Sequence, residues 1–505
     1  MANQLDVIPR PVPRSAPATP ATTQTPAPNR PGSAQGPSPS KKPSELSILG
    51  IITVLSGVFL SMVDFFIVNV ALPSIDHDLH ASSAILELII AGYGIAYALL
   101  LVIGGRLGDT FGRRRLFITG MAAFGVTSLL CGLAPSSVTL VAARVLQGAS
   151  AALMVPQVLA TIQATTTGPH RARAISMYGA AGGLAAVVGQ ILGGVLISAD
   201  IGGLGWRPIF LVNVPIVAAG LLCAVRMIPE TRATTPPKLD VPGTVLLGLT
   251  VLTLLIPLTE GRATGWPLWA WLMLTISPVS AAAFMAVEHH LERTGGLPLV
   301  PPSLLKMPSM RNGLLASVPF FVGFGGFMFV YAVVLQQGIH LSALQAGLAL
   351  TPMGVAFLIT SLNSPRWVTS HGRRVIWVGA LIQAVGLGSI VLAVFTQWPH
   401  LTPLNLAVGM TIAGAGQGLI MSPLFRVVLS KVPTEQAGIG SGVLITTQQV
   451  ALALGVATVG GLFLSLSEAR SVGAQYAFIT VLCVQILIAG VVMVASRRLP
   501  RSVRG

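Results

Sequence analysis

The sequence predicts an all-α protein that crosses a membrane many times. Of its 505 residues, 53% are hydrophobic and 9% are charged, and the mean hydropathy is +0.80. Soluble domains contain about 25% charged residues. Apolar stretches long enough for a helix to cross a bilayer, about 20 residues, recur along most of the chain. Basic residues cluster in alternate connections between these stretches, as they do in multi-pass membrane proteins.

The chain begins with a tail that differs from the remainder in composition. Residues 1–45 contain 11 of the 36 prolines and no apolar stretch, which predicts a disordered tail and not a secretory signal. After it we expect fourteen membrane-spanning helices joined by short connections. Their predicted ranges are 47–72, 84–105, 114–134, 137–160, 172–198, 207–228, 241–259, 268–288, 312–336, 343–362, 374–396, 402–425, 437–465 and 473–496.

The distribution of Lys and Arg tests this number of spans, because basic residues concentrate in cytoplasmic connections. If the tail is cytoplasmic, 26 of the 30 basic residues lie on the cytoplasmic side, and three, Arg207, Arg262 and Arg470, lie outside. The remaining one, Arg144, falls within a predicted span. We therefore expect an even number of spans and two cytoplasmic termini in the cytoplasmic (inner) membrane.

Two short motifs occur twice in the chain. Gly112-Arg113-Arg114 recurs as Gly372-Arg373-Arg374, and Gln147-Gly148 recurs as Gln417-Gly418. Duplicated helix bundles are common in transporters. We expect two pseudo-symmetric six-helix bundles and a central helix pair. The predicted units are a cytoplasmic tail (1–45), an N-terminal bundle (46–230), a two-helix insertion (231–295), a C-terminal bundle (296–498) and a second cytoplasmic tail (499–505).

A charged loop, defined here as residues 105–114, is expected between the second and third spans. It runs from Gly105 to Arg114 and includes Asp109, Gly112 and Arg113. A carboxylate at a helix end can face the positive N-terminus of another helix or pair with arginine. We predict that this loop is a conformational latch that closes the cytoplasmic side. The second half has Thr369 where Asp109 would align, so the latch would be one-sided.

The first span contains an acidic residue, Asp64, followed by an amide, Asn69. An ionisable group inside a membrane span is costly and usually faces a cavity or a functional site. Partial desolvation favours its neutral form, which suits a group that exchanges a proton. We predict that Asp64 couples transport to protons or balances a cationic substrate. Asn69 is a weaker candidate, because amides in spans also satisfy backbone groups.

The fourth span contains Arg144 together with Gln147 and Gly148. A guanidinium at hydrocarbon depth requires an acceptor or water beside it. The sequence leaves open whether Arg144 meets Asp64 or instead caps backbone carbonyl groups.

These motifs resemble those of the major facilitator superfamily, in its fourteen-span drug:proton antiporter branch. The resemblance covers about residues 45 to 498 and rests on the charged loop, on the sequence from Asp64 to Pro73, and on the pattern R-x-x-Q-G at Arg144, Gln147 and Gly148. It implies that Asp109 stabilises cytoplasmic closure, and that Arg144 takes part in proton transfer or tunes a neighbouring acid. In the fifth span, Gln190 replaces the proline of the antiporter signature G-P-x-x-G-G, which ends here in Gly193-Gly194.

The predicted function is proton-coupled export of small, lipophilic or cationic drug-like compounds by alternating access, which is multidrug efflux and would confer antibiotic resistance. Gln448, in a polar patch of the thirteenth span, and Gln190 are further candidates for substrate contact. None of the five lysines follows a glycine, so the phosphate-binding loop of an ATP-driven pump is absent. We expect a proton gradient as the energy source, no cofactor, no nucleotide and no nucleic acid. The expected partners are a small-molecule substrate, protons and the bilayer.

Two other functions remain open from the sequence. The first is export of one specific neutral or anionic metabolite by the same fold. The second is a polytopic membrane enzyme that acts on lipid, for which the candidate cluster is Asp76, His77, Asp78 and His80. We expect a solvated outer loop there, with no metal, and no enzymatic activity. The three cysteines lie in apolar stretches, which favours neither disulfides nor a zinc site.

Overall fold

The computed structural model describes residues 46–81, 83–232, 240–261, 264–296, 298–433, 436–468 and 473–499. Within these ranges, fourteen helices are long and apolar enough to cross a membrane, which confirms the predicted number. The tail predicted at 1–45 and the last six residues of the chain lie outside the described residues.

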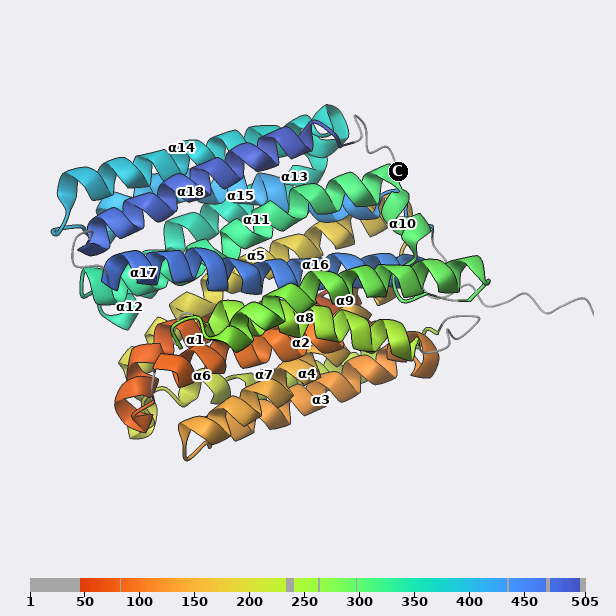
Figure 1. Ribbon diagram of the computed structural model, residues 1–505, viewed down its shortest axis with the longest axis horizontal. Helices are drawn as coiled ribbons and strands as arrows, with labels where there is room; N and C mark the ends of the chain where they lie inside the picture. Colours follow the sequence, from red (N-terminus) through yellow and green to blue (C-terminus); the bar gives the residue numbers. More distant parts are fainter. Residues whose placement is uncertain are drawn as a thin grey trace, which may run out of the picture. The chain divides into compact units, whose positions relative to one another are not determined.

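The first six spans form the N-terminal bundle, and two helices follow it (Figure 1). The sixth span is broken at Val212 into α6 and α7. The elements are α1 (Ile48–Leu79), α2 (Ser83–Phe111), α3 (Arg113–Gly132), α4 (Ser137–Thr165), α5 (Gly168–Ala199), η1 (Ile201–Gly203), α6 (Pro208–Leu211), α7 (Asn213–Met227), and the central pair α8 (Val241–Glu260) and α9 (Leu268–Arg293).

The last six spans form the C-terminal bundle, in which three spans are composite. Two of them include a short π-helical turn. The elements are α10 (Pro302–Lys306), α11 (Pro308–Val333) with η2 (Val334–Gly338), α12 (Ala343–Leu348) with α13 (Thr351–His371), α14 (Arg374–Gln397), α15 (Pro403–Leu429), α16 (Ala437–Gly455) with η4 (Val456–Gly460) and α17 (Gly461–Glu468), and α18 (Gly473–Ser496).

The two bundles repeat one packing pattern, as the duplicated motifs predict. In the first, α1 packs on α5, α2 on α4, and α3 on both α4 and α7. In the second, α11 packs on α16, α13 on α15, and α14 on both α15 and α18. The central helix α8 packs on α2 of one bundle and on α16 of the other, beside its partner α9 (Figure 1).

The helix ends differ from the predicted ones at two places that matter for the site. Helix α1 continues to Leu79 through Pro73, and α2 continues to Phe111 instead of ending at residue 105. The predicted ranges followed hydrocarbon thickness. A helix can continue beyond the apolar core, because its backbone hydrogen bonds do not depend on the lipid around it.

Helices α2 and α4 approach each other closely at Gly104. A Cβ atom on Gly104 would lie 2.0 Å from the carbonyl oxygen of Ala152, whereas one on the neighbouring Gly105 would lie 3.7 Å from the nearest atom, in Pro156. Backbone cannot yield as a flexible side chain can, so the first glycine is required by packing and the second is not.

We therefore expect Gly104→Ala to destabilise the protein and Gly105→Ala to leave its stability unchanged. Overpacking of this kind costs about 1–3 kcal/mol. The measurement is the midpoint of thermal unfolding of the purified protein in detergent, with Gly105→Ala as the matched control. Equal midpoints for the two variants would contradict the packing argument.

Helix α5 lies between α1 and the second bundle. A Cβ on Gly189 would lie 2.7 Å from the carbonyl oxygen of Val63, and one on Gly194 would lie 2.4 Å from that of Ala343. At the other end of the bundle interface, the amide of Gln163 donates to the hydroxyl oxygen of Ser441 at 2.7 Å. The two bundles are thus in contact near both ends of their helices.

Candidate functional site

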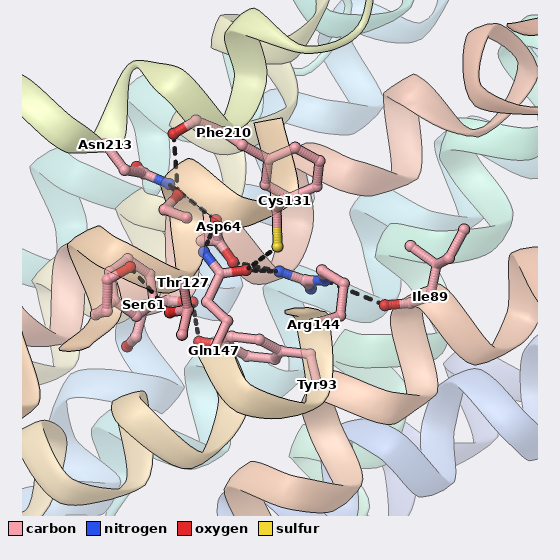
Figure 2. A network of polar contacts seen from close by, with 12 residues as sticks. Ser61, Asp64, Ile89, Tyr93, Thr127, Cys131, Arg144, Gln147, Phe210 and Asn213 are labelled. Carbon is pink, nitrogen blue, oxygen red and sulfur yellow. Dashed lines mark hydrogen bonds and ion pairs between the residues drawn. The ribbon is translucent and has the colours of Figure 1, made fainter. Parts of the chain in front are cut away.

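A buried ion pair connects two of the predicted site residues. Asp64 on α1 and Arg144 on α4 have no exposed side-chain surface, and Arg144 Nη1 donates to Asp64 Oδ2 (Figure 2). The other carboxylate oxygen, Oδ1, accepts from the amide of Gln147 at 2.9 Å and from that of Asn213 at 2.8 Å. The carboxylate is therefore held by three donors from two helices, α4 and α7.

The guanidinium of Arg144 is fixed by more than its ion pair. Its Nε donates to the carbonyl oxygen of Ile89 at 3.1 Å, and its Nη1 also donates to Gln147 Oε1 at 2.8 Å. Its central carbon lies 4.3 Å from the centroid of the Tyr93 ring, a cation–π contact. Among the described residues, Nη2 has no hydrogen-bond acceptor.

A second layer of hydrogen bonds positions Asn213. Asn213 is the first residue of α7, directly after the break at Val212. Its Nδ2 also contacts the hydroxyl of Ser128 at 2.9 Å, and that hydroxyl donates to the carbonyl oxygen of Phe210 at 2.9 Å. The thiol of Cys131 contacts Gln147 Oε1 at 3.4 Å. The start of the sixth span therefore supplies a donor to Asp64, the amide of Asn213, and an acceptor, the carbonyl oxygen of Phe210, that orients the Ser128 hydroxyl (Figure 2).

This arrangement supports two charge states. With Asp64 ionised, the pair is neutral overall and all three donors have an anionic acceptor. A proton on Asp64 removes that acceptor and leaves the buried charge of Arg144 without its counter-ion, which is costly in a low-dielectric interior. Protonation therefore weakens the contacts that join α1, α4 and α7 at the pair and favours their rearrangement.

Three other predicted residues lie outside this network. Asn69 is buried on a different face of α1, five residues from Asp64. Gln190 on α5 donates to the carbonyl oxygen of Met328 on α11 at 3.2 Å, so it joins the two bundles. Gln448 on α16 is 2% exposed. Of the predicted residues Asp64, Arg144, Asn69, Gln147, Gln190 and Gln448, the structure brings together the two charged residues and Gln147.

The charged loop is mostly helical. Residues from Gly105 to Phe111 form the last turns of α2, and α3 begins at Arg113, so Gly112 alone separates the two helices. Gly112 has φ of 108°, and a Cβ there would lie 2.4 Å from Glu230 Oε1. The positive φ requires glycine at this position, whereas the Glu230 side chain could move away from a Cβ.

Asp109 pairs within its own loop in the part of the chain that the structure describes. Its Oδ1 accepts from Arg113 Nη2 at 2.8 Å and from Nε at 3.1 Å. Arg114 donates from its guanidinium to the carbonyl oxygen of Val225 and from its backbone N–H to Glu230 at 3.3 Å. These contacts join the loop to the end of the sixth span, in the same bundle, and the role of Asp109 as a latch stays a prediction.

We expect Asp109→Asn to slow transport without unfolding the protein. The substitution leaves Arg113, whose side chain is 12% exposed, without its anionic acceptor. We expect loss of this charge-assisted hydrogen bond, which contributes about 1.5–3 kcal/mol, to disfavour the closed state of the cytoplasmic side by roughly tenfold or more and so to slow the cycle. The control is Arg115→Ala, at a side chain that is 71% exposed. If Asp109→Asn transports at the same rate as the control, the pairing of Asp109 in the charged loop has no role in the transport cycle.

A second group of charges, which was not predicted as a site, lies beside the charged loop. Glu288 on α9 is fully buried and accepts from the backbone N–H of Val300 at 2.7 Å, and its carboxyl group lies beside that of Asp240, since both are next to Gly243. Asp240 caps α8 by accepting from the N–H of Gly243 at 2.9 Å. Arg106 of the charged loop donates to the carbonyl oxygen of Pro298. The central pair is therefore tied to the end of α2.

The acidic residue Asp78, from the cluster considered as a possible enzyme site, makes contacts that join two helices. The carboxylate of Asp78, at the end of α1, pairs with Arg207 at 2.7 Å and accepts from the indole N–H of Trp206 at 3.0 Å. These contacts attach the end of α1 to the start of the sixth span.

Asn213, Ser128 and Tyr93 complete the site but were not among the predicted residues. The available signal for Asn213 was an amide within the apolar span at 207–228. Asn69 gives the same signal, and only the packing of the helices distinguishes them. Tyr93 and Ser128 are ordinary residues for an apolar span and give no signal.

Two repeated bundles of six spans and a central helix pair, with a fully buried ion pair inside one bundle, define a multi-pass membrane transporter. The family model of the Major Facilitator Superfamily matches residues 54–456 and 313–504. The chain belongs to this superfamily.

Relatives and solved structures agree with this assignment. The "Probable actinorhodin transporter" of Streptomyces coelicolor is 38% identical over 83% of this chain and 72% of that protein. "Drug efflux pump JefA" of Mycobacterium tuberculosis is 32% identical over 80% of this chain and 78% of that protein. The structure of the human organic anion transporter MFSD10 (TETRAN) has the same fold, with a TM-score of 0.60, 17% identity, and coverage of 88% of this chain and 99% of that one.

Proposed function

We propose that this protein exports small lipophilic or cationic drug-like compounds across the cytoplasmic (inner) membrane in exchange for protons. The observation that carries the proposal is the buried Asp64–Arg144 pair with its amide donors, because uptake of one proton by this pair weakens the contacts that join its helices. The names of two relatives, an actinorhodin transporter and a drug efflux pump, support the substrate class and the direction. The distribution of basic residues supports cytoplasmic termini.

In the proposed cycle, the two bundles alternate between openings on opposite sides of the membrane. A proton from outside neutralises Asp64, Arg144 loses its counter-ion, and the network of Gln147 and Asn213 reorganises. Release of that proton to the cytoplasm restores the ion pair. The contact of Gln163 with Ser441 and the close approach of Gly194 to Ala343 lie near opposite ends of the bundle interface, so each opening breaks one of them. The proton gradient supplies the energy, with no cofactor and no nucleotide.

A second candidate is export of one specific neutral or anionic metabolite. It is favoured by the name of the relative that is 38% identical, which specifies a single compound. Asp64 would then couple transport to protons without contacting a substrate charge.

The test is transport by the purified protein in proteoliposomes with an imposed proton gradient. The probes are ethidium, a lipophilic cation, and 1-naphthol, a neutral aromatic compound. We expect gradient-dependent transport of ethidium that stops when an ionophore collapses the gradient. If the protein transports 1-naphthol but not ethidium, the substrate is not a lipophilic cation, and export of one specific neutral or anionic metabolite becomes the preferred function. Transport of neither compound by folded protein would overturn the proposal of multidrug export.

A further inference from the structure

An apolar pocket lies where the central helix α8 meets both bundles. Its walls come from α1, α2, α8, α11, α16, η4 and α17, and its empty volume, including its open side, is about 630 Å³. It does not include Asp64 or Arg144, so it is distinct from the ion-pair site. Helix α8 lies beside α2 and α16 in Figure 1, which places this pocket at the seam between the bundles and the insertion.

The lining selects an uncharged ligand. Two aromatic rings, Phe65 and Phe329, face aliphatic and small residues, and no charged side chain lines the pocket. Its side-chain hydroxyl, that of Thr259, already donates to the carbonyl oxygen of Leu255 at 2.8 Å. A charged group in this pocket would lose its hydration without compensation. A planar, apolar group would be stabilised by burial and by contact with the two rings.

The pocket has a buried floor and a half-buried rim. Phe65, Leu255 and Phe329 are buried, whereas Leu258 and Gly461 are half-buried. A Cβ atom on Gly461 would meet nothing within 4 Å. The π-helical turn η4 directly precedes Gly461 in this wall, and such turns recur at functional sites. The glycine after the π turn, Gly461, thus leaves space in this wall for a ligand.

The pocket lies at the ends of its helices that are remote from the charged loop. It uses Leu255 and Leu258 near the C-terminus of α8, whereas Asp240, beside the charged loop, caps the N-terminus. The outward face of α8 is apolar, with Val245 61% and Leu249 40% exposed. In a membrane this face contacts lipid. On the pocket side, the rim residues Leu258 and Gly461 are half-buried within membrane-spanning helices, so the rim borders the bilayer.

Ring contacts connect the pocket to the ion pair. Phe65 follows Asp64 in the chain, and its ring centroid lies 5.9 Å from that of Tyr93. Tyr93 in turn holds the guanidinium of Arg144 by the 4.3 Å cation–π contact. A ligand that displaces Phe65 therefore acts on the residues that hold the proton-exchanging pair.

We propose that this pocket binds the uncharged, ring-bearing part of the exported compound at the boundary between the protein and the bilayer. The proposal rests on the export function proposed above. It assigns to the central insertion a direct role in substrate binding, through α8.

The experiment measures where a neutral aromatic probe binds, without a proton gradient. The parent protein in proteoliposomes is labelled with a photoactivatable diazirine derivative of 1-naphthol, and the labelled peptides are identified by mass spectrometry. Two variants fill the pocket from different walls, Leu258→Trp on α8 and Gly461→Phe on α17. The controls are Leu249→Trp, on the lipid-facing side of α8, and Gly490→Phe, where a Cβ would also meet nothing within 4 Å. Folding of each variant is checked by size-exclusion chromatography.

We expect labelling of the peptides of α8 and α17 to fall about tenfold in both filled variants and in the presence of excess 1-naphthol, and to be unchanged in both controls. Equal labelling of filled and control variants would overturn the proposal. A second experiment uses a phosphatidylcholine with a photoactivatable acyl chain. If this lipid labels the same peptides and excess 1-naphthol does not reduce the labelling, the occupant of the pocket is lipid and the proposal is overturned.

Transport of 1-naphthol and ethidium by the same variants separates this proposal from the export function. Slower transport of at least one compound in both filled variants, with control rates unchanged, supports the pocket as part of the route. If the filled variants and the controls transport both compounds at equal rates, the exported compound does not pass through this pocket. If the parent labels as expected but transports neither compound, the export function fails while occupancy of the pocket by a neutral aromatic compound stands.

Discussion

Asp64→Asn is expected to abolish transport driven by a proton gradient while leaving the protein folded in the membrane. Asparagine has the same shape and retains an oxygen for the donors from Arg144 or Gln147, but it cannot exchange a proton. Arg144 keeps its contacts with Ile89, Gln147 and Tyr93, so the bundle stays folded while the contacts around the substituted side chain weaken, as they do when Asp64 is protonated. The loss should therefore appear in coupling and not in folding.

The measurement compares two kinds of transport by Asp64→Asn in proteoliposomes. Gradient-driven transport of ethidium should fall to the level of protein-free liposomes, while exchange of ethidium without a gradient persists. The matched control is Asp78→Asn on the same helix, whose side chain is 44% exposed and pairs with Arg207 at the surface. Its gradient-driven rate should equal that of the parent, because exposed pairs contribute about 0–1 kcal/mol. Parental gradient-driven transport by Asp64→Asn would exclude Asp64 as the coupling residue.

The charged residues of the site could be predicted from the sequence because charges in apolar spans are rare. Asp64 and Arg144 stand out for this reason. Their contact could not be predicted, since it depends on how α1 and α4 are rotated against each other. The rotation of α4 is set in part by its close approach to α2 at Gly148, where a Cβ would lie 2.2 Å from the carbonyl oxygen of Tyr93. Such distances follow from packing in three dimensions and not from spacing along the chain.

The amides show why the remainder of the site could not be predicted. Asn69 and Asn213 both lie in apolar spans, but only Asn213 reaches Asp64. It does so because of how the sixth span packs against α1 and α3, which determines the direction of the Asn213 side chain. The predicted range of 207–228 agrees with the observed span Pro208–Met227 and contains no information on this rotation. The number of spans was easier to predict, since it depends on composition and length, which tertiary packing does not alter.

The charged loop illustrates the difference between recognising a motif and predicting its contacts. The residues Gly105, Asp109, Gly112, Arg113 and Arg114 were recognised from the sequence, and a contact across the two bundles was expected of them. In the described residues, Asp109 pairs with Arg113 four positions away. Arg106 provides the longer connection, to Pro298 beyond the central pair. Because arginine side chains are long, several acceptors lie within reach, and sequence spacing does not select among them.

Arg144→Gln is expected to destabilise the protein strongly, and adding Asp64→Asn is expected to restore much of the lost stability without restoring transport. Removal of Arg144 leaves the fully buried Asp64 with two amide donors and no counter-ion. Breaking a buried pair in this way costs about 3–5 kcal/mol, whereas replacement of both partners by neutral groups is often nearly neutral. In Asp64→Asn/Arg144→Gln, two neutral amides occupy the positions of the pair, and neither can exchange a proton.

The measurements are the midpoint of thermal unfolding in detergent and gradient-driven transport of ethidium, for the parent, both single variants and the double variant. The midpoint of Arg144→Gln should be the lowest of the four, and it should approach that of the double variant as the pH is lowered, because a proton on Asp64 removes the unpaired charge. Asp64→Asn alone leaves the positive charge of Arg144 unpaired. Its unfolding midpoint should therefore not approach that of the double variant as the pH is lowered. If the double variant is as unstable as Arg144→Gln at every pH, the packing of Arg144 against Tyr93 and Phe210 stabilises the bundle, and its charge does not.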